Sequence, residues 1–419
     1  MLRAVLLDHS ASVPSAPFDL SEPPDGFYES PFHWYRLLHD RAPIARARDG
    51  SLMLSRWADV VQVYRDASTF SSDKRVEFAP KFGVGPLFRH HTTSLVFNDD
   101  PYHGRVRRRL ATALTPRAVN VIADRLADYC RDLVDCIAER GWCEAIADYA
   151  GAVPVRVIGD MLDVPEADRA LLRDWSLAIL GALEPLIDEQ ARRRGDQAVQ
   201  AFTNYVETLI GQRRARPQAS PEDLLSRLMR DGENGEEPLA PDELVHNMIF
   251  LLNAGHETTT NLIGSALHLL AFRPDLAEAL RADPDSVPEF VEEVLRCESP
   301  NQLGNRRVVR SCTIGDVNVA EGTLLTLMIG AANRDPSVFP EPDRFDITRR
   351  PNRHLAFGAG VHQCAGLSLA RIEAQVAIRA WLNGFDAFTL DGAVARRERV
   401  RFRGLAMLPI ATRRRSLRA

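Results

Sequence analysis

A glycine-rich loop that presents one cysteine at the start of a helix is the feature that most restricts how this chain can fold. Residues 357–366 read Phe-Gly-Ala-Gly-Val-His-Gln-Cys-Ala-Gly, and good helix formers follow from Leu367. The loop glycines allow tight backbone conformations and the close approach of a flat ligand, because they have no Cβ atom. Backbone N–H groups and the positive end of a helix dipole favour the thiolate form of Cys364. The loop therefore predicts that Cys364 is a thiolate ligand.

The loop resembles the haem-binding loop of the cytochromes P450, Phe-Gly-x-Gly-x-His-x-Cys-x-Gly, and every fixed position of that pattern is filled. The resemblance implies that Cys364 binds the iron of heme b (iron protoporphyrin IX) and that Phe357, Gly358 and Gly366 contact this cofactor. A thiolate pushes electron density onto the iron and favours cleavage of the O–O bond. A lone cysteine is more often a buried, inert side chain. The full match at fixed spacing disfavours that interpretation.

The composition indicates one large globular unit. The 419 residues contain no Gly/Ser linker, and 45% are hydrophobic and 26% charged, so a large core is expected. A net charge of −5 gives no electrostatic reason to expect a nucleic-acid partner. The N-terminal apolar run is too short for a signal sequence or a membrane anchor, so we expect a cytoplasmic protein with no membrane anchor. Six scattered cysteines without a CxxC pair suggest neither a zinc site nor disulfides.

The resemblance covers roughly residues 30–410 and implies a mainly α fold with a small β region, the cytochrome P450 fold, in a single large domain. We expect an irregular N-terminal arm over residues 1–30, the haem domain over 31–410 and a basic C-terminal tail over 411–419. Apolar periodicity and turn residues predict the elements. These are a helix from residue 31, a hairpin over 43–46 and 52–55, a helix over 57–66, a loop over 78–96, helices over most of 101–230 with breaks at Pro154, Pro165, Pro185 and Pro217, strands over 308–319 and 324–329, a Pro-rich meander over 333–345, and a final hairpin over 400–410.

The longest helical pattern covers residues 241–273, and its apolar positions lie on nearly every face. Such a helix belongs in the middle of a large fold. It contains the segment Ala-Gly-His-Glu-Thr-Thr over residues 254–259. Thr258 and Ala254 are four residues apart, so the Thr258 hydroxyl is expected to bond to the Ala254 carbonyl and loosen the helix.

This segment matches the oxygen-activation motif of the cytochromes P450, (Ala/Gly)-Gly-x-(Asp/Glu)-Thr-(Thr/Ser). The resemblance implies that Thr258 donates to bound oxygen, that Glu257 relays protons from water, and that Ala254 contacts the haem. In isolation, a Glu-Thr pair would be interpreted as a cap or a solvent-facing pair. Its place in an apolar helix, in a chain that also has the cysteine loop, favours the catalytic interpretation.

Glu293 and Arg296 match a further motif of the family, Glu-x-x-Arg. Their spacing places both on one helix face, where a charge-assisted hydrogen bond forms. The meander over residues 333–346 is also similar to that of bacterial members, and the resemblance implies that Arg344 completes a three-residue ion network. This network is expected to be structural rather than catalytic.

Haem carries two propionates, so its pocket needs cationic or donor groups at the rim. His103 and Arg107 are four residues apart and share a helix face. The resemblance assigns both to propionates, together with Arg306 and His354. Arg307 leaves the Arg306 assignment open by one residue. Each of these side chains, taken singly, is more often a solvated surface charge.

Four arginines near His103 carry more positive charge than two propionates need: Arg105, Arg107, Arg108 and Arg109. Their outward-facing members fit a basic patch for an acidic electron donor such as a ferredoxin. An ordinary solvated helix face is an equally good interpretation.

The resemblance places the substrate-lining residues in four segments: the loop over 82–96, the long helix near Leu251 and Ala254, residues 301–304, and the last hairpin near Phe402. Gly304 is expected to leave volume above the haem, and the amides of Asn301, Gln302 and Asn305 to orient a polar group of a medium to large substrate. The alternative is that these amides bond only to backbone in the turn after Pro300.

Together, these features predict a bacterial-type haem-thiolate monooxygenase that inserts one oxygen atom of O2 into a small organic molecule. No flavin or nicotinamide domain fits in the remaining sequence, so ferredoxin and ferredoxin reductase are the expected electron donors. A peroxide-driven peroxygenase is a second interpretation, but it has no need of Glu257 and Thr258. A noncatalytic haem sensor or carrier is a third, and turnover with a surrogate reductase separates it from the first.

Overall fold

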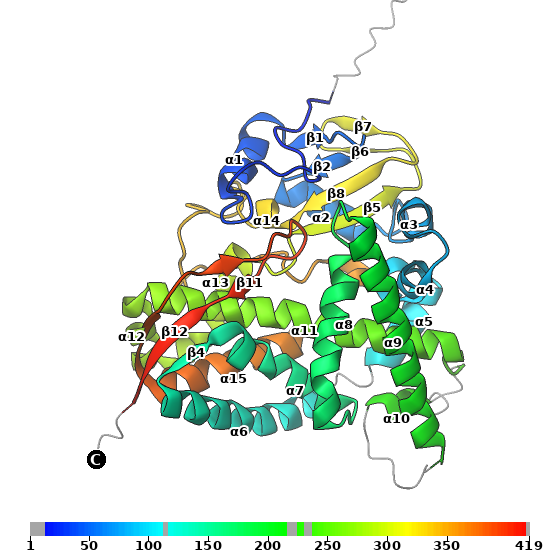
Figure 1. Ribbon diagram of the computed structural model, residues 1–419. Coiled ribbons are helices and arrows are strands. Elements are labelled where there is room, and N and C mark those ends of the chain that lie inside the picture. Colours follow the sequence, from blue (N-terminus) through cyan, green and yellow to red (C-terminus); the bar gives the residue numbers. More distant parts are fainter. Residues whose placement is uncertain (1–12, 112–115, 216–223, 230–236, 416–419) are drawn as a thin grey trace, which may run out of the picture.

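The computed structural model describes residues 13–111, 116–215, 224–229 and 237–415. Its α-helices are α1 (Phe32–Arg41), α2 (Trp57–Arg65), α3 (Arg75–Phe82), α4 (Pro86–Thr93), α5 (Tyr102–Ala111), α6 (Pro116–Arg140), α7 (Ala152–Met161), α8 (Arg169–Gly181), α9 (Glu189–Ala215), α10 (Leu224–Met229), α11 (Pro241–Phe272), α12 (Pro274–Ala282), α13 (Val287–Cys297), α14 (Ile329–Ala332) and α15 (Leu367–Gly384). Its strands are β1 (Ile44–Arg46), β2 (Leu52–Leu54), β3 (Phe70–Ser71), β4 (Trp142–Glu144), β5 (Leu303–Val308), β6 (Cys312–Ile314), β7 (Val317–Val319), β8 (Leu324–Met328), β9 (Phe385–Leu390), β10 (Ala395–Arg396), β11 (Leu405–Met407) and β12 (Pro409–Arg414). The expected mainly α fold with a small β region is confirmed (Figure 1).

The largest sheet lies at the end of the molecule where the described chain begins (Figure 1). Its strand order is β1-β2-β8-β5-β3, with β2 parallel to β8 and the other neighbours antiparallel. The predicted hairpin over 43–46 and 52–55 is therefore confirmed as β1 and β2. Apolar residues of this sheet pack against α2, and Tyr64 of α2 is part of that core. The sheet thus holds α2 and β5 next to each other, and both border the site described below.

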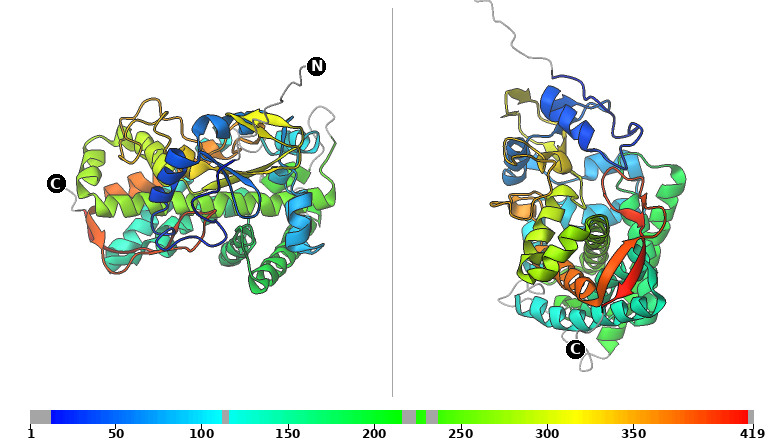
Figure 2. Two further views of the ribbon diagram at one scale, coloured as in Figure 1. Left: turned by 90° about the horizontal axis from the view of Figure 1, so that it is seen from above. Right: turned by 90° about the vertical axis from the view of Figure 1, so that its left-hand side faces the viewer.

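Helix α11 passes through the middle of the helical part (Figures 1 and 2). It contacts α4, α7, α8, α9, α13 and α15, and apolar residues on several of its faces are buried. The predicted central helix over 241–273 is confirmed, because a helix that is apolar all round lowers the free energy most when neighbours cover every face. Within the described ranges, no helix has the length and apolar content needed to cross a bilayer.

The predicted loop over 78–96 is wrong, because this segment contains most of α3 and all of α4. Gly83 ends α3 with a φ of +64°, and Pro86 starts α4 at a position where a missing N–H has no cost. Two glycines and a proline therefore separate two short helices instead of marking one loop. Pro154 likewise lies in the first turn of α7 and does not interrupt the helix, while Pro217 lies outside the described residues.

The C-terminal strands also differ from the prediction. The expected single strand over 308–319 is wrong: it contains only the last residue of β5, and the rest includes a hairpin of β6 and β7 that turns at Gly315 (φ +53°). The expected hairpin over 400–410 is instead β11, which pairs with β10, and β12, which lies between β4 and β9. Strand β12 pairs with β9 as far as Arg414, so residues 411–414 belong to a sheet and not to a tail. In Figure 1, β12 lies at the lower left and β1 and β2 lie at the top.

Candidate active site

Two glycines of the cysteine loop, Gly358 and Gly360, have positive φ angles. Gly360 has a φ of +71°, and a Cβ atom there would collide with the Tyr64 carbonyl oxygen of α2. The Cys364 N–H donates to the Phe357 carbonyl at 2.9 Å and closes the loop. Helix α15 then begins at Leu367. The loop is thus held between α2 and α15, and this fixes where Cys364 lies.

The Cys364 side chain lies at the accessible surface of the loop. Surrounding protein atoms desolvate the thiol and raise its pKa, while the Gly366 N–H and the charges of Arg107 and Arg371 act in the opposite direction. A backbone N–H donor and nearby cations are the groups that stabilise a thiolate. The sulfur is therefore accessible, and one backbone N–H and two arginines act to stabilise its thiolate form.

Cationic and imidazole side chains gather beside this loop. The His103 and His362 rings lie 3.9 Å apart between centroids, and the Arg306 Cζ atom lies 5.2 Å from the centre of the Tyr64 ring. Burial, followed by the positive charges of these neighbours and of Arg107, lowers the pKa of His362 to about 2. The two arginines and the two neutral imidazoles can donate hydrogen bonds to a shared anionic partner. The cluster therefore fits a cofactor with two carboxylates.

The structure gives Arg306 and Arg307 different surroundings. This bears on the propionate assignment, which the sequence alone left open between the two residues. The Arg307 Nε atom lies 3.7 Å from a carboxylate oxygen of Glu77, away from the imidazole pair. Arg306 instead lies close enough to His362 to be the first charge that lowers its pKa after burial. Sequence reasoning gave His362 no role of its own. Its fixed place in the loop pattern, two residues before Cys364, was the signal that could have found it.

His354 is engaged elsewhere. Its Nε2 atom lies 3.1 Å from a Glu292 carboxylate oxygen, and its Nδ1 atom accepts from the Ala356 N–H at 3.3 Å. Arg371 of α15 binds the same Glu292 carboxylate through two hydrogen bonds of 2.7 and 2.8 Å. Both ring nitrogens of His354 thus have protein partners. A propionate contact from His354 requires that one of these bonds be exchanged.

The motif in α11 combines a hydroxyl and a buried acid. The Thr258 hydroxyl donates to the Ala254 carbonyl at 2.7 Å, the bond that the spacing predicts, although α11 stays a continuous helix. Glu257 is 1% exposed, and one carboxylate oxygen accepts from Arg399 at 2.5 Å. Burial raises the pKa of Glu257, and Arg399 and then Arg397 oppose that shift. The acid is therefore removed from water and dependent on one arginine.

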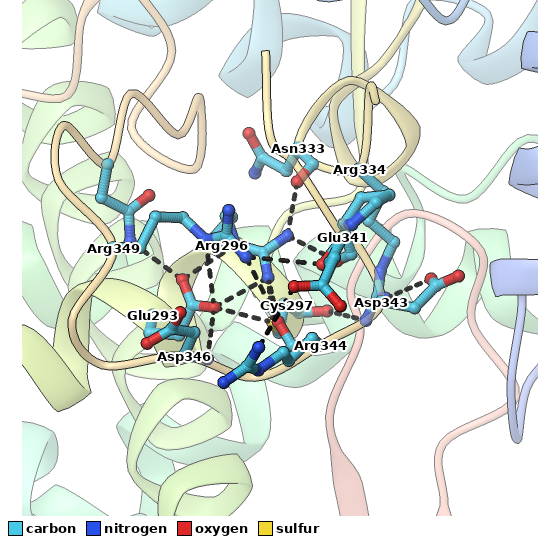
Figure 3. A network of polar contacts seen from close by, with 12 residues as sticks. Glu293, Arg296, Cys297, Asn333, Arg334, Glu341, Asp343, Arg344, Asp346 and Arg349 are labelled. Carbon is cyan, nitrogen blue, oxygen red and sulfur yellow. Dashed lines mark hydrogen bonds and ion pairs between the residues drawn. The ribbon is translucent and has the colours of Figure 1, made fainter. Parts of the chain in front are cut away.

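Glu293 and Arg296 form a fully buried ion pair at the centre of a polar network (Figure 3). Two hydrogen bonds of 2.8 Å join the guanidinium to both carboxylate oxygens. Arg296 also donates to the carbonyls of Asn333, Pro342 and Arg344 at 2.8 to 3.0 Å. The pair therefore fixes the meander to α13, next to the segment that leads into the cysteine loop.

The prediction that the Arg344 side chain is the third member of this ion network is wrong. Its side chain is 62% exposed and pairs with Glu341, and only its carbonyl oxygen joins the network (Figure 3). The second cation beside Glu293 is Arg349, whose Nε atom lies 3.5 Å from a carboxylate oxygen. The family pattern identified the meander correctly but could not decide which of its arginines turns inward, because that depends on the loop backbone.

The segment after Pro300 enters strand β5 of the N-terminal sheet instead of leaving volume for a ligand. A Cβ atom on Gly304 would collide with the Tyr64 hydroxyl. The Gln302 amide accepts from a buried tyrosine hydroxyl and donates to a backbone carbonyl, both at 2.6 Å. Asn305 donates to Thr326 of β8 at 3.2 Å. The expected pocket role of Gly304, Gln302 and Asn305 is therefore wrong, because Tyr64 fills the space beside Gly304 and both amides are bonded to other parts of the protein.

The basic cluster near His103 is not one surface patch. Arg105 pairs with Glu243 of α11, and Arg109 is buried, with a hydrogen bond to the Leu228 carbonyl at 3.3 Å. Arg108 is exposed and Arg107 is half-buried. The outward positive charge of α5 is thus smaller than the sequence suggested.

Comparison with known proteins assigns the chain that carries these site residues to a family. Residues 173–409 match the family Cytochrome P450. The 6-deoxyerythronolide B hydroxylase of Saccharopolyspora erythraea is 33% identical over 404 residues, which span 92% of this chain and 97% of that protein. The chain is a cytochrome P450. The cyclomarin C epoxidase CymV of Salinispora arenicola is 35% identical over 362 residues, 86% of this P450 and 90% of the epoxidase.

Solved structures agree with this assignment. The crystal structure of P450BioI in complex with an acyl carrier protein that carries hexadec-9Z-enoic acid superimposes with a TM-score of 0.86, at 32% identity, over 92% of this P450 and 99% of that chain. A Bacillus megaterium P450 in complex with testosterone gives a TM-score of 0.83 at 29% identity, over 91% and 97%. The predicted fold is confirmed.

The protein is therefore a haem-iron monooxygenase, an oxidoreductase of the same class as the hydroxylase and the epoxidase that it resembles. The relatives do not favour the peroxygenase or the sensor interpretation. The residues around Cys364 fit the cofactor on their own chemistry, since an accessible thiol with thiolate-stabilising groups lies beside two arginines and two imidazoles that can donate to carboxylates.

Proposed function

We propose that Cys364 is the thiolate ligand of heme b in this P450. The observation that carries this assignment is the accessible sulfur beside the four-membered cluster of His103, Arg107, Arg306 and His362, which supplies partners for the propionates. His354 joins them only after exchanging one of its present bonds. The residues proposed to contact the ring are Phe357, Gly358, Gly366 and Ala254.

Bound haem iron supplies the activation of O2 and the transfer of one oxygen atom to an organic substrate. Within the chain, Thr258 holds a hydroxyl proton at Oγ1, and Glu257 takes up or releases a proton at its carboxylate. The two residues are consecutive in α11. In the proposed relay, the acid receives a proton from water and the hydroxyl passes one on. We assign Glu257 and Thr258 as the catalytic residues on this basis.

The proposed partners are a small organic substrate, O2, and a ferredoxin with its reductase. Arg108 is exposed on α5, the helix whose Arg107 acts on the Cys364 thiol, so its positive charge lies on the surface near the cysteine loop. Charge of this sign attracts an acidic ferredoxin and speeds its encounter. A cytoplasmic location is part of the same proposal, because the reductase chain operates there.

The reduced carbon monoxide complex tests the ligand assignment. The wild-type protein should show the red-shifted Soret band that is typical of thiolate ligation, and Cys364→Ser should lose that shift. Cys136 provides the matched control, because it is another exposed free cysteine, on α6. Cys136→Ser should keep the wild-type spectrum. A folded, haem-loaded Cys364→Ser variant with an unchanged shift would exclude this cysteine as the ligand.

A further inference from the structure

Two cations from distant segments meet at one turn of the chain. Lys81 lies in α3, and Arg401 lies between β10 and β11. The Arg401 Nε atom donates to the Leu183 carbonyl at 3.0 Å, and the Lys81 Nζ atom donates to the carbonyl of the next residue, Glu184. Because these acceptors are consecutive carbonyls just after α8, the two charged groups lie near each other. We call them the Lys81–Arg401 pair.

Neither member of this pair is bonded to an acid. The other hydrogen bonds of Arg401 go to the Leu303 carbonyl, at 3.1 Å, and to the Asn305 amide oxygen. Within the described ranges, neither Lys81 nor Arg401 forms an ion pair with a carboxylate. Charges removed from water without an opposite charge are costly, and burial accordingly lowers the pKa of both groups, that of Lys81 to about 8. Two buried positive charges therefore lie side by side with only neutral partners.

Glu184 compensates only part of this charge. Its carboxylate opposes the effect of burial on the pKa of both cations, but it is bonded to backbone. One oxygen accepts from the N–H groups of Val400 and Arg401 at 2.9 and 3.1 Å. The neighbouring cation Lys74 has its own acid, Glu77, at 3.6 Å. Two positive charges and the one negative charge of Glu184 leave an excess of one positive charge, which a bound monoanion would neutralise.

Arg401 also keeps hydrogen-bond donors for such an anion. A guanidinium has five N–H groups, and Arg401 uses three of them, one on each nitrogen, for Leu183, Leu303 and Asn305. One N–H on each terminal nitrogen is left over in the described part of the chain. Arg401 is half-buried, so part of it stays accessible. Donors on both terminal nitrogens match the two oxygens of a carboxylate.

The pair lies between the motif of α11 and the cation cluster beside the cysteine loop. Arg399, two residues before Arg401, donates to Glu257 of α11. On the other side, the charge of Arg401 acts on Tyr64, whose ring centre lies 5.2 Å from the Arg306 Cζ atom. A molecule held by the pair therefore lies next to the proposed haem site.

Aromatic rings surround a histidine on which both cations act. His91 is neutral, because burial, and then the charges of the pair, lower its pKa to about 3. Its ring centre lies 5.4 to 5.5 Å from those of three phenylalanines, Phe78, Phe82 and Phe97. These rings belong to the apolar cluster around α3, α4 and α11 or pack against it. The charged pair thus adjoins an apolar region, and this combination suits a ligand with a charged end and an apolar body.

We propose that the substrate of this P450 carries a carboxylate on an apolar body, and that Arg401 and Lys81 bind the carboxylate. The proposal rests on the proposed function, in which Cys364 binds haem beside this region, and it names the substrate class for that site. Arg401 supplies two N–H donors and Lys81 an ammonium charge. A monoanion is favoured over a dianion because it matches the single excess charge. Both residues determine specificity and take no part in the chemistry.

Imidazole probes test the proposal without turnover. An imidazole that binds haem iron shifts the Soret band, so the affinity of 1-alkylimidazoles can be read directly. These are compared at neutral pH with imidazol-1-yl alkanoic acids of the same chain lengths, which differ only in the terminal carboxylate. Wild type should bind the acid more tightly by roughly 10- to 100-fold at the best chain length, as expected for hydrogen bonds between charged groups.

Variants assign this preference to the pair. Arg401→Gln should abolish the preference for the acid and leave haem content and the affinity for 1-alkylimidazoles unchanged, whereas Arg401→Lys should keep part of it. Lys81→Gln should reduce the preference, and it remains informative if Arg401→Gln folds poorly, because Lys81 makes a single hydrogen bond in the described part of the chain. Arg193→Gln is the matched control. Arg193 is an exposed arginine of α9 that pairs with Glu189, and its loss should leave the preference at the wild-type value.

The opposite results would overturn the proposal. They are equal affinities for acids and alkylimidazoles in wild type, no Soret shift with any probe, or an unchanged preference in both Arg401→Gln and Lys81→Gln. A loss of haem, or an equal loss of affinity for both probes, in Arg401→Gln would show that this arginine serves the cofactor and would also overturn it.

The result also stays distinct from the proposed function. The reduced carbon monoxide complex tests the Cys364 assignment separately. A missing red shift together with an intact preference for acids would refute the thiolate ligand and leave the carboxylate site in place. A normal red shift without any preference would leave the thiolate ligand in place and refute the carboxylate site.

Discussion

Two of the buried glutamate–arginine pairs in the described part of the chain, Glu293–Arg296 and Glu257–Arg399, differ in how completely their polar atoms are satisfied. The Glu293 carboxylate has two bonds to Arg296, and it also accepts from the Asp346 N–H at 2.9 Å and from the Asn352 amide at 3.1 Å. The Glu257 carboxylate has one arginine partner and one oxygen without a donor. Both oxygens of the Glu293 carboxylate thus accept hydrogen bonds and we call this pair closed, whereas one oxygen of Glu257 accepts none from the described residues and we call that pair open.

The difference shows how the same two side chains serve structure in one place and chemistry in another. A buried pair whose every atom is bonded has a single low-energy arrangement and holds its surroundings in place. A pair with an unsatisfied oxygen has less to lose when its partner moves away. The Glu293 pair therefore suits the support of the cysteine loop, and the Glu257 pair suits a group that must exchange a proton.

The largest expected effect is on stability at the closed pair. Glu293→Ala or Arg296→Ala leaves a fully buried charge without its partner, which costs about 3 to 5 kcal/mol of unfolding free energy. Haem content should fall with it, because the meander no longer holds the segment that leads to Cys364. Denaturant unfolding and the haem-to-protein ratio measure both. A soluble, fully haem-loaded variant with wild-type stability would place the pair outside the support of the loop.

The next largest effect is on the catalytic rate and concerns Thr258, the neighbour of Glu257 in α11. Thr258→Ala removes the hydroxyl donor but should leave folding and haem binding intact, because the bond to the Ala254 carbonyl is one among many in α11. Loss of proton transfer of this kind lowers a rate by roughly 10² to 10⁴. Reducing equivalents should then appear as hydrogen peroxide. Peroxide release per electron, with a surrogate ferredoxin and reductase, should rise above wild type, and an unchanged ratio would argue against the relay.

The smallest effect is a difference in pH dependence between the two regions. Burial raises the pKa of Glu257 above its ordinary 4.5, so the folded state binds the proton more tightly than the unfolded state. Its contribution to the unfolding free energy then falls as the pH rises above that value. Burial also disfavours the Glu292 anion, but hydrogen bonds from Arg371 and His354 outweigh this and lower its pKa to about 2. That contribution is present above the ordinary pKa and is lost as the pH falls toward 2.

Unfolding of wild type, Glu257→Gln and Glu292→Gln over the acidic and neutral range measures these slopes. The wild-type advantage over Glu257→Gln should decrease with rising pH, and the advantage over Glu292→Gln should increase. Slopes of the same sign would mean that the two carboxyl groups have similar environments, and the contrast between the two regions would fail.

The sequence predicted the parts of the fold that depend on local pattern. The cysteine loop, α11 and the Thr258 hydroxyl bond follow from residue types at fixed spacing, and the structure places each in the expected element. The prediction of a loop over residues 78–96 was wrong because glycine and proline occur both in loops and in the short gaps between helices. The prediction of a tail over residues 411–414 was wrong because arginines, which suggest an exposed tail, also occur at the solvent-exposed end of a paired strand.

The site residues divide in the same way. The partners of Glu257 and Glu293 include Arg399 and Arg349, which lie 142 and 56 positions further along the chain. No spacing rule identifies such partners, because only the folded backbone brings them together. Gly304 shows the converse: its small size reflects the nearby Tyr64 hydroxyl and not an open pocket. Local motifs identified Glu257 and the Glu293–Arg296 pair, whereas Arg399 and Arg349 could be identified only from the tertiary packing.

The same substitution at both acids tests the central contrast most directly. Glu257→Gln and Glu293→Gln are compared as oxygen consumption per bound haem, with a surrogate ferredoxin and reductase and at matched haem loading. Glu257→Gln should be slower than wild type by roughly 10² to 10⁴, because the relay loses its titrating group. Glu293→Gln should lose haem and stability but turn over at close to the wild-type rate per haem. Equal rates per haem in the two variants, or a wild-type rate in Glu257→Gln, would contradict the account.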